Sequence, residues 1–216
     1  MNAAGITGSP VPHFVAHGIG LGWGVTAKAA KGTAVDDLNH LADLIRIRNF
    51  INASVGRIIQ GPAETGRIAE FVASQIFDIE LADTFVNKSV DGWFRSPAQL
   101  KETSVNVKYR STLSRRLNLI DSSDLSNHPE FYLAFRGPFI AKGPAADKVL
   151  PFLIESVYLF AAEQLISAMT AEGYRSFGPS VRKKFWDAAM IYPEQVNQTL
   201  ILTDQQRAAL ALFSPT

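Results

Sequence analysis

The stretch from Thr103 to Arg110 alternates between two sets of side chains without a break. Side chains of a β-strand point to opposite faces with a period of two residues. One face would carry Thr103, Val105, Val107 and Tyr109, and the other would carry Ser104, Asn106, Lys108 and Arg110. The pattern therefore predicts a strand with one face in a core and with Asn106 and Lys108 as neighbours on a polar face.

Two acidic residues upstream of this strand are spaced to meet its polar face. Asp91 precedes a short strand predicted over residues 93–95, and Glu70 lies on a helix predicted over residues 65–79. Each acid also has an interpretation that needs no ligand. An Asp-Gly pair, as at position 91, is typical of a hairpin turn, and Glu70 is placed to be an exposed acid or a partner of Arg67. Spacing alone leaves these alternatives open.

The composition limits the chemistry that is open to the chain. Its 216 residues are 47% apolar and 19% charged and include no cysteine, which excludes disulfides, thiolate nucleophiles and cysteine-bound zinc. The net charge is only +1, so any contact with nucleic acid must come from local basic patches. No apolar run is long enough to span a bilayer, and the N-terminus lacks the pattern of a signal peptide. We therefore expect a cytoplasmic protein that is not associated with a membrane.

The rest of the pattern predicts helices, then strands, then helices, within one domain over residues 35–216. Residues 1–34 are rich in Gly, Ala and Pro and are predicted to form an arm. Further helices are predicted over residues 35–60, 161–172, 180–191 and 207–213, and further strands over residues 82–88, 131–135 and 152–160. The predicted fold class is α+β, with a mixed central sheet covered by helices on both faces, an α/β/α arrangement.

The order of these features resembles that of the PD-(D/E)XK nuclease superfamily. The resemblance is carried by the helix GRIAEFVASQIFDIEL around Glu70, the Asp-Gly pair at position 91 and the strand that ends in NVKY. Within the superfamily, the chain is similar to uncharacterised bacterial members with an NVK strand. The resemblance covers residues 64–160 and implies a restriction-endonuclease-like fold. It also implies hydrolysis of phosphodiester bonds in DNA, expected to be double-stranded, with Mg²⁺ or Mn²⁺ as the cofactor.

The resemblance implies roles for individual residues. Asp91 would be the principal metal ligand, and Glu70 would bind the metal or orient one of its waters. Lys108 would lie beside the attacking water, and Asn106 would occupy the position of a further metal ligand. Basic residues would hold the backbone phosphates, namely Arg110, Arg115, Arg116, Arg182, Lys183 and Lys184.

Asn106 departs from the family, which usually carries Glu, Asp or Gln at this position. An amide contributes a neutral oxygen in place of a charge, which weakens metal binding. Glu70 could supply the missing charge, or Glu155 in the predicted strand over residues 152–160 could point at the site. The interpretation that we favour for Glu155 is a buried ion pair with an arginine.

Two functions from different classes therefore stay open. The first is a metal-dependent DNA endonuclease of a restriction or defence kind, for which a homodimer is one arrangement. The second is a catalytically weak or inactive relative that uses the same fold to bind nucleic acid or another protein. The residue at position 106 distinguishes the two functions. A neutral side chain at a metal-ligand position is expected in an inactive relative and not in an active nuclease.

Overall fold

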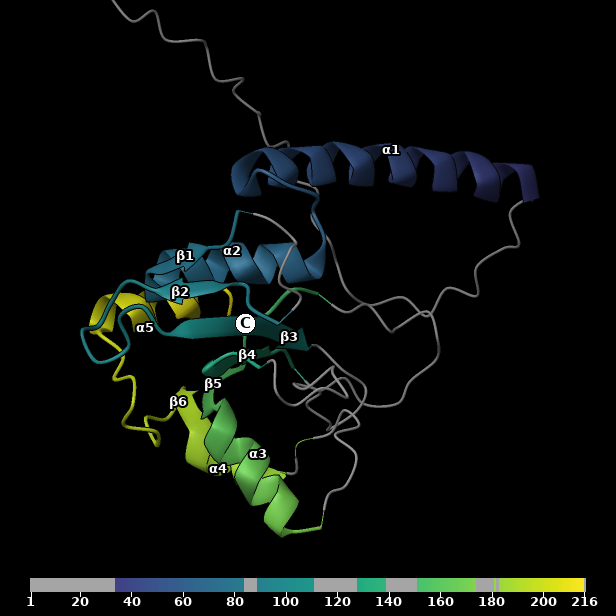
Figure 1. Ribbon diagram of the computed structural model, residues 1–216. Coiled ribbons are helices and arrows are strands. Elements are labelled where there is room, and N and C mark those ends of the chain that lie inside the picture. The colour runs from purple at the N-terminus through teal and green to yellow at the C-terminus, as the bar shows by residue number, and fades with distance from the viewer. Residues whose placement is uncertain are drawn as a thin grey trace, which may run out of the picture. The chain divides into compact units, whose positions relative to one another are not determined.

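The computed structural model describes most of the chain (Figure 1). The described residues are 34–83, 89–110, 128–138, 151–173, 181 and 183–215. The chain divides into two units, Met1–Ile45 and Arg46–Thr216. The first helix, α1 (Ala34–Ile59), runs without a break through the boundary between them and confirms the helix predicted over residues 35–60. The predicted arm lies outside the described residues except for its last residue.

A six-stranded mixed sheet lies at the centre of the second unit. Its strands lie side by side in the order in which they occur in the sequence. β3 and β4 are parallel, and the other neighbouring pairs are antiparallel. The strands are β1 (Ile79–Leu81), β2 (Gly92–Phe94), β3 (Ser104–Arg110), β4 (Phe131–Arg136), β5 (Ser156–Ala161) and β6 (Met190–Tyr192).

Helices cover both faces of this sheet, so the fold class is α+β as predicted. The covering helices are α2 (Thr65–Phe77), α3 (Ala162–Ala171), α4 (Lys183–Ala189) and α5 (Asp204–Ala211). Residues of α2 and α5 belong to a buried cluster on one face, and residues of α3 and α4 belong to a second cluster on the other face (Figure 1). No helix in the described ranges combines the length and the apolar character that a membrane crossing requires.

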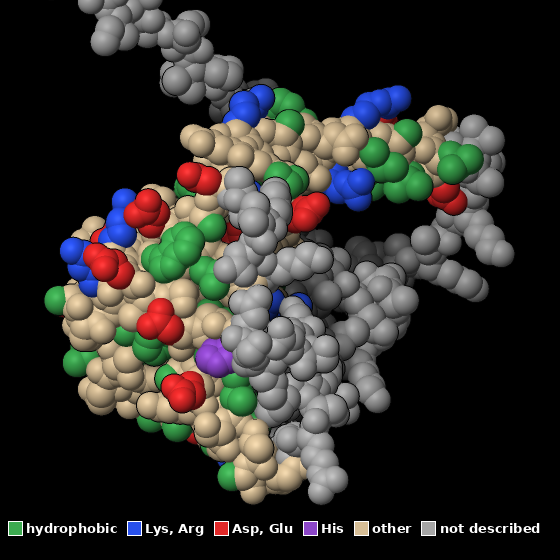
Figure 2. All heavy atoms as spheres, viewed as in Figure 1, with side chains coloured by type: hydrophobic (Ala, Val, Ile, Leu, Met, Phe, Trp, Pro, Cys, Tyr) green, Lys and Arg blue, Asp and Glu red, His purple; other side chains and the backbone are tan. Residues whose placement is uncertain are grey.

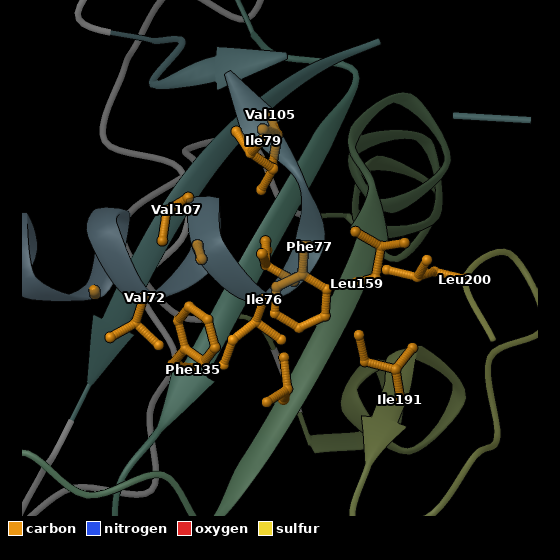
Figure 3. Packing of buried hydrophobic residues seen from close by; sticks show 14 of the residues in the cluster. Val72, Ile76, Phe77, Ile79, Val105, Val107, Phe135, Leu159, Ile191 and Leu200 are labelled. Atoms are coloured by element: carbon orange, nitrogen blue, oxygen red, sulfur yellow. The ribbon is translucent and has the colours of Figure 1, made fainter. Parts of the chain in front are cut away.

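Alternation along β3 separates the two faces, as the sequence predicts. Val105, Val107 and Tyr109 are buried in the cluster that includes α2, and Asn106 and Lys108 alternate with them along the strand. Figure 3 shows the two valines among side chains of α2 and the neighbouring strands. Full burial of a side chain of this size contributes about 1.5–3 kcal/mol, so this cluster fixes which face of β3 is turned away from α2.

The first strand begins earlier than predicted. The helix that was expected to reach residue 79 ends sooner, because Asp78 adopts a left-handed conformation with φ of 53°. Ile79 then begins β1, which is held by pairing with β2. The prediction of a first strand over residues 82–88 is therefore wrong at its start, and residues 84–88 lie outside the described part of the chain.

The strand predicted over residues 152–160 begins later than expected, at the start of β5. The Leu153 N–H donates to the Tyr109 hydroxyl (3.1 Å), and the Ile154 N–H donates to the Phe213 carbonyl (2.7 Å). These hydrogen bonds hold residues 153 and 154 against segments other than β4, and contact with β4 begins at Glu155, whose N–H donates to the Arg136 carbonyl (2.8 Å). Apolar composition alone does not reveal such partners.

The helix predicted over residues 180–191 ends at Ala189 and is followed by β6, which pairs with β5. A helical conformation is disfavoured for the residue before a proline, and Pro193 follows directly after β6. Ile191 is fully buried in the cluster that includes α2. The remaining predictions for β4 and α3 are confirmed, and α5 begins with the expected capping box.

Gly92 in β2 occupies a position where a larger residue does not fit. It pairs with Leu81 of β1 and with Val105 of β3. A Cβ at this position would lie 2.3 Å from the Glu80 carbonyl oxygen and 2.9 Å from a side-chain carbon of Ile79. The close approach of β1 to β2 therefore requires glycine.

We expect Gly92→Ala to lower the free energy of unfolding by about 1–3 kcal/mol, the usual cost of overpacking. Gly66→Ala on α2 is the matched control, because a Cβ there meets nothing within 4 Å and alanine favours a helix more than glycine does. The control is expected to leave stability unchanged or to raise it. Denaturant unfolding of both variants measures the difference, and a Gly92→Ala variant as stable as the wild type would contradict this packing.

Candidate functional site

The candidate site lies where β2 and β3 diverge. The two strands pair through Gly92 and Trp93, whereas β3 continues alongside β4 as far as Arg110. Just before β2, the Asp91 N–H donates to the Val105 carbonyl (2.9 Å). Further along β3, the Val107 N–H has a side chain as its acceptor and not a neighbouring strand. It donates to the Asp91 carboxylate (Oδ2) at 2.7 Å. The carboxylate therefore satisfies a backbone donor of β3 at the point where the neighbouring strand leaves it.

Asp91 is not a hairpin-turn residue. Its carbonyl oxygen accepts from the Ala82 N–H (2.9 Å) at the end of β1, and its own N–H is bonded to β3. Gly92 is the first residue of β2 and pairs with both neighbouring strands, so it does not lie at the tip of a hairpin. The hairpin interpretation of the Asp-Gly pair is excluded, so the carboxylate of Asp91 needs an explanation of its own.

The surroundings of Asp91 disfavour its charged form. Burial raises the pKa of the Asp91 carboxyl above its ordinary value of 3.8, and the nearby Glu70 carboxylate raises this pKa further. The hydrogen bond from Val107 and the positive charges of Lys108 and Arg67 oppose this rise without cancelling it. The structure thus brings Asp91 within electrostatic range of both Glu70 and Lys108.

Glu70 reaches the site from α2 and is partly buried. Its Oε2 accepts a hydrogen bond from Arg67 Nη1 at 2.7 Å, which is the ion pair that the sequence offered as an alternative. The ion pair does not remove the effect of Glu70 on Asp91, whose pKa still responds to the Glu70 charge. Glu70 is therefore paired with Arg67 and also affects the pKa of Asp91.

Asn106 is the most deeply buried of the predicted site residues that the structure describes, with 3% of its surface exposed. Its side-chain oxygen, Oδ1, has no hydrogen-bond partner among the described residues. A buried acceptor left without a partner costs about 1–3 kcal/mol, and such groups call for an explanation such as a bound ion or a catalytic role. Lys108 follows two residues later on the same face of β3 and is half-buried.

The donor atoms at this site suit a hard divalent cation. The Glu70 charge raises the pKa of Asp91, although Lys108 and Arg67 lower it, and Mg²⁺ prefers oxygen ligands such as carboxylates. The described residues contain no group of three or more acidic, histidine or cysteine side chains placed to hold a metal. Asn106 lies on the face of β3 that is turned away from α2, the helix that carries Glu70.

The basic residues predicted to contact DNA are spread over separate parts of the chain. Arg110 is half-buried at the end of β3, in register with Arg136 of β4. Lys183 and Lys184 lie on α4, which contacts β5, and Lys184 forms an ion pair with Glu172. The others, Arg115, Arg116 and Arg182, lie outside the described residues. The structure therefore places Arg110 on the strand of the candidate site and the two lysines beyond β4.

Glu155 differs from its prediction. It is exposed and precedes β5, and its N–H donates to the Arg136 carbonyl (2.8 Å). The favoured interpretation of Glu155 as a buried, ion-paired acid is wrong, because the strand that would have buried it begins one residue later. Sequence reasoning also missed that the Val107 N–H is the hydrogen-bond partner of Asp91. An alternating pattern of side chains does not predict which groups bond to the backbone of a strand.

A scan against protein-family models and a search of curated proteins each find no match to this chain. Fold class alone does not assign a function. The argument for function therefore depends on the geometry and electrostatics of the site around Asp91.

Ionisation of Asp91 is expected to make stability depend on pH. Because the folded protein holds the proton on this carboxyl more tightly than the unfolded chain, the contribution to stability is present below pH 3.8 and is lost as the pH rises through the folded pKa. Asp91→Asn keeps an acceptor for the Val107 N–H and removes the charge. The variant is therefore expected to be more stable than the wild type at neutral pH and equal to it in acid.

Urea unfolding of the wild type and Asp91→Asn across this pH range, without divalent cations, measures the difference. A stability gap that does not change with pH would contradict the assignment of a raised pKa to Asp91. A variant that is less stable than the wild type at neutral pH would show that the ionised carboxylate is stabilising, contrary to its surroundings.

Proposed function

We propose that this protein is a metal-dependent nuclease that hydrolyses phosphodiester bonds in DNA. The observation that carries the proposal is the position of the Asp91 carboxylate, bonded to the Val107 N–H and within electrostatic range of Glu70 and Lys108. Paired carboxylates beside a lysine match the requirements of phosphoryl chemistry, in which a metal and a cation both act on a reacting phosphate. Membership of the PD-(D/E)XK superfamily, with a restriction-endonuclease-like fold, is part of the same proposal.

The metal would be held by Asp91, Glu70 and the Oδ1 oxygen of Asn106. When bound, Mg²⁺ or Mn²⁺ supplies a Lewis acid that polarises the scissile phosphate and lowers the pKa of a coordinated water. The fit rests on two features of this chain: the Glu70 charge, which raises the pKa of Asp91, and the buried Asn106 oxygen that has no partner among the described residues.

Lys108 would act on the substrate itself. Its ammonium group, on the same face of β3 as Asn106, would stabilise the negative charge that develops on the phosphate oxygens and would favour loss of a proton from the attacking water. The hydrogen bond from Val107 would keep the Asp91 carboxylate in a fixed orientation. Arg67 would hold the Glu70 carboxylate in place through their ion pair.

The DNA is proposed to be double-stranded, with its backbone held by local basic side chains. Arg110 lies on the strand of the site, and the other predicted contacts are Arg115, Arg116, Arg182, Lys183 and Lys184. A cytoplasmic location is part of this proposal. Because these contacts are made to phosphates, binding is expected to weaken as the salt concentration rises.

A second candidate function has a specific observation in its favour. Asn106 contributes a neutral oxygen where an acid would bind a metal more tightly, and its side chain is buried. A protein that has lost catalysis but kept the fold would act as a module that binds nucleic acid or another protein. The two candidates differ in whether purified protein cleaves DNA in the presence of Mg²⁺.

We expect the purified wild type to cleave plasmid DNA with Mg²⁺ or Mn²⁺, and Asp91→Asn and Lys108→Ala each to lower the cleavage rate by about 100-fold or more. Lys101→Ala is the matched control for lysine removal, because Lys101 is exposed and pairs with Glu102. This control should cleave at the rate of the wild type. A wild type that is inert on DNA with either metal would overturn the nuclease proposal in favour of the binding module.

Asn106→Asp tests whether the amide is a weakened metal ligand. The substitution preserves size in a buried position and adds one negative charge, so it should tighten Mg²⁺ binding and raise the cleavage rate at limiting metal. Isothermal titration with Mg²⁺ and single-turnover cleavage measure the two effects. Weaker metal binding in Asn106→Asp than in the wild type would show that Asn106 is not a ligand.

A further inference from the structure

Arg136 at the end of β4 is a half-buried arginine whose side chain lies over a tryptophan. Its guanidinium carbon is 4.9 Å from the centre of the Trp186 ring. Among the described residues, the Arg136 side chain forms no hydrogen bond and no ion pair. An arginine carries five N–H donors, and charged side chains that are withdrawn from solvent are usually paired. The donors of Arg136 are therefore available to a ligand.

Several other basic side chains in the described part of the chain have acidic partners on the protein, namely Arg67 with Glu70, Arg95 with Asp78 and Lys184 with Glu172. Figure 2 shows basic and acidic side chains mixed over one face of the molecule. Glu155 precedes Ser156, the residue that pairs with Arg136 in the sheet, and Asp187 follows Trp186. Neither of these acids forms an ion pair with Arg136. The described residues therefore supply no acidic partner for Arg136.

Trp186 of α4 gives the guanidinium a rigid support. The tryptophan is 2% exposed, and its Nε1–H donates to the Val181 carbonyl at 2.9 Å. The Tyr158 ring packs beside it, with 6.0 Å between the ring centres. An arginine is attracted to the face of an aromatic ring, so this contact restricts the motion of the Arg136 side chain. A guanidinium that is already held in place loses less entropy when it binds a ligand.

Two further cations lie on the same face of the sheet as Arg136. In the parallel pairing of β3 with β4, Arg110 is the partner of Arg136 and Lys108 is the partner of Ala134. Lys108 and Arg110 are two residues apart on β3, so they point to one face. With a rise of about 3.3 Å per residue and about 4.8 Å between strands, the Cα atoms of Lys108 and Arg136 lie on the order of 8 Å apart. Positive charge is therefore concentrated beside the candidate site.

We propose that Arg136, held over Trp186, binds a phosphate group. A guanidinium donates two parallel N–H bonds to phosphate oxygens, and the charges of Arg110 and Lys108 add to the attraction for an anion. The phosphate is assigned to the DNA backbone, next to the phosphate on which Lys108 acts, and this assignment rests on the proposed function. The anion site itself does not, because it follows from the contacts of Arg136.

Titration with inorganic phosphate tests the anion site, with the indole N–H of Trp186 as the NMR reporter. Phosphate bound to the guanidinium over the ring should shift this resonance in a saturable way in the wild type and not in Arg136→Gln. Chloride at the same ionic strength is the reference for a general effect of salt. A shift that is absent from the wild type, or equal in the two proteins, would overturn the site.

Binding of a labelled DNA duplex, measured by fluorescence anisotropy without divalent cations, tests the assignment to the DNA backbone. Arg136→Gln should weaken binding about 10-fold or more, because it removes hydrogen bonds to a charged group. It should also lower the slope of log K against log salt concentration by about one unit, as loss of one phosphate contact does. The matched control is Arg95→Gln, which removes one charge from an exposed arginine that pairs with Asp78 and should bind DNA as the wild type does.

Arg136→Lys separates charge from geometry. Lysine keeps the positive charge and lacks the planar fork of donors, so this variant should keep the salt slope of the wild type and bind DNA less tightly. Equal affinity in Arg136→Lys and the wild type would overturn the proposed paired contact. If Arg136 had only a structural role, its variants would melt at a lower temperature with unchanged phosphate response, DNA affinity and salt slope, which would also overturn the proposal.

The outcomes distinguish this inference from the proposed function. A wild type that binds DNA through Arg136 and does not cleave it would contradict the nuclease proposal and support the phosphate site. A wild type that binds inorganic phosphate through Arg136 and does not bind DNA would overturn the assignment of the phosphate to the DNA backbone.

Discussion

The hydrogen bond from the Val107 N–H to the Asp91 carboxylate is the interaction on which the candidate site depends. β2 stops pairing with β3 at this point, while β3 continues beside β4. A backbone donor on β3 would otherwise lose its neighbouring strand, and unsatisfied buried donors are costly. The carboxylate satisfies this donor, and the divergence of the strands leaves it close to Glu70 from α2 and to Lys108 from β3. The Asp91 side chain therefore both completes the hydrogen bonding of β3 and forms part of the candidate site.

Two features of this arrangement are unfavourable to stability. Burial and the Glu70 charge raise the pKa of the Asp91 carboxyl, and the side-chain oxygen of Asn106 is buried without a hydrogen-bond partner in the described part of the chain. Both features oppose folding, and the proposed cation would favour the ionised form of Asp91. Departures from the rules of local consistency are expected at functional sites, so the two departures on adjoining elements support the proposed metal site. A steric constraint acts in the same region, because β1 approaches Gly92 of β2 too closely for any side chain at that position.

The sequence predicts the parts of this structure that depend on short-range periodicity. A period of two identifies β3 and separates Val105 and Val107 from Asn106 and Lys108, because a strand presents alternate residues to a core. The sequence fails where distant partners decide the outcome. The start of β5 depends on hydrogen bonds from Leu153 to Tyr109, and β6 forms by pairing with β5. Alternation and spacing singled out Asp91, Glu70 and Lys108, and a resemblance supplied their roles, whereas the bond between Asp91 and Val107 and the lack of a partner for the Asn106 oxygen among the described residues come from the structure.

The most direct test of this account is the dependence of the Val107 amide chemical shift on pH, recorded by NMR with and without Mg²⁺. This amide is bonded to the Asp91 carboxylate, so its shift reports ionisation of that group. The account predicts a midpoint above 3.8 without metal and a lower midpoint with Mg²⁺, because a bound cation favours the carboxylate. A midpoint at or below 3.8 that does not move with Mg²⁺ would contradict the claim that Asp91 is a buried metal ligand.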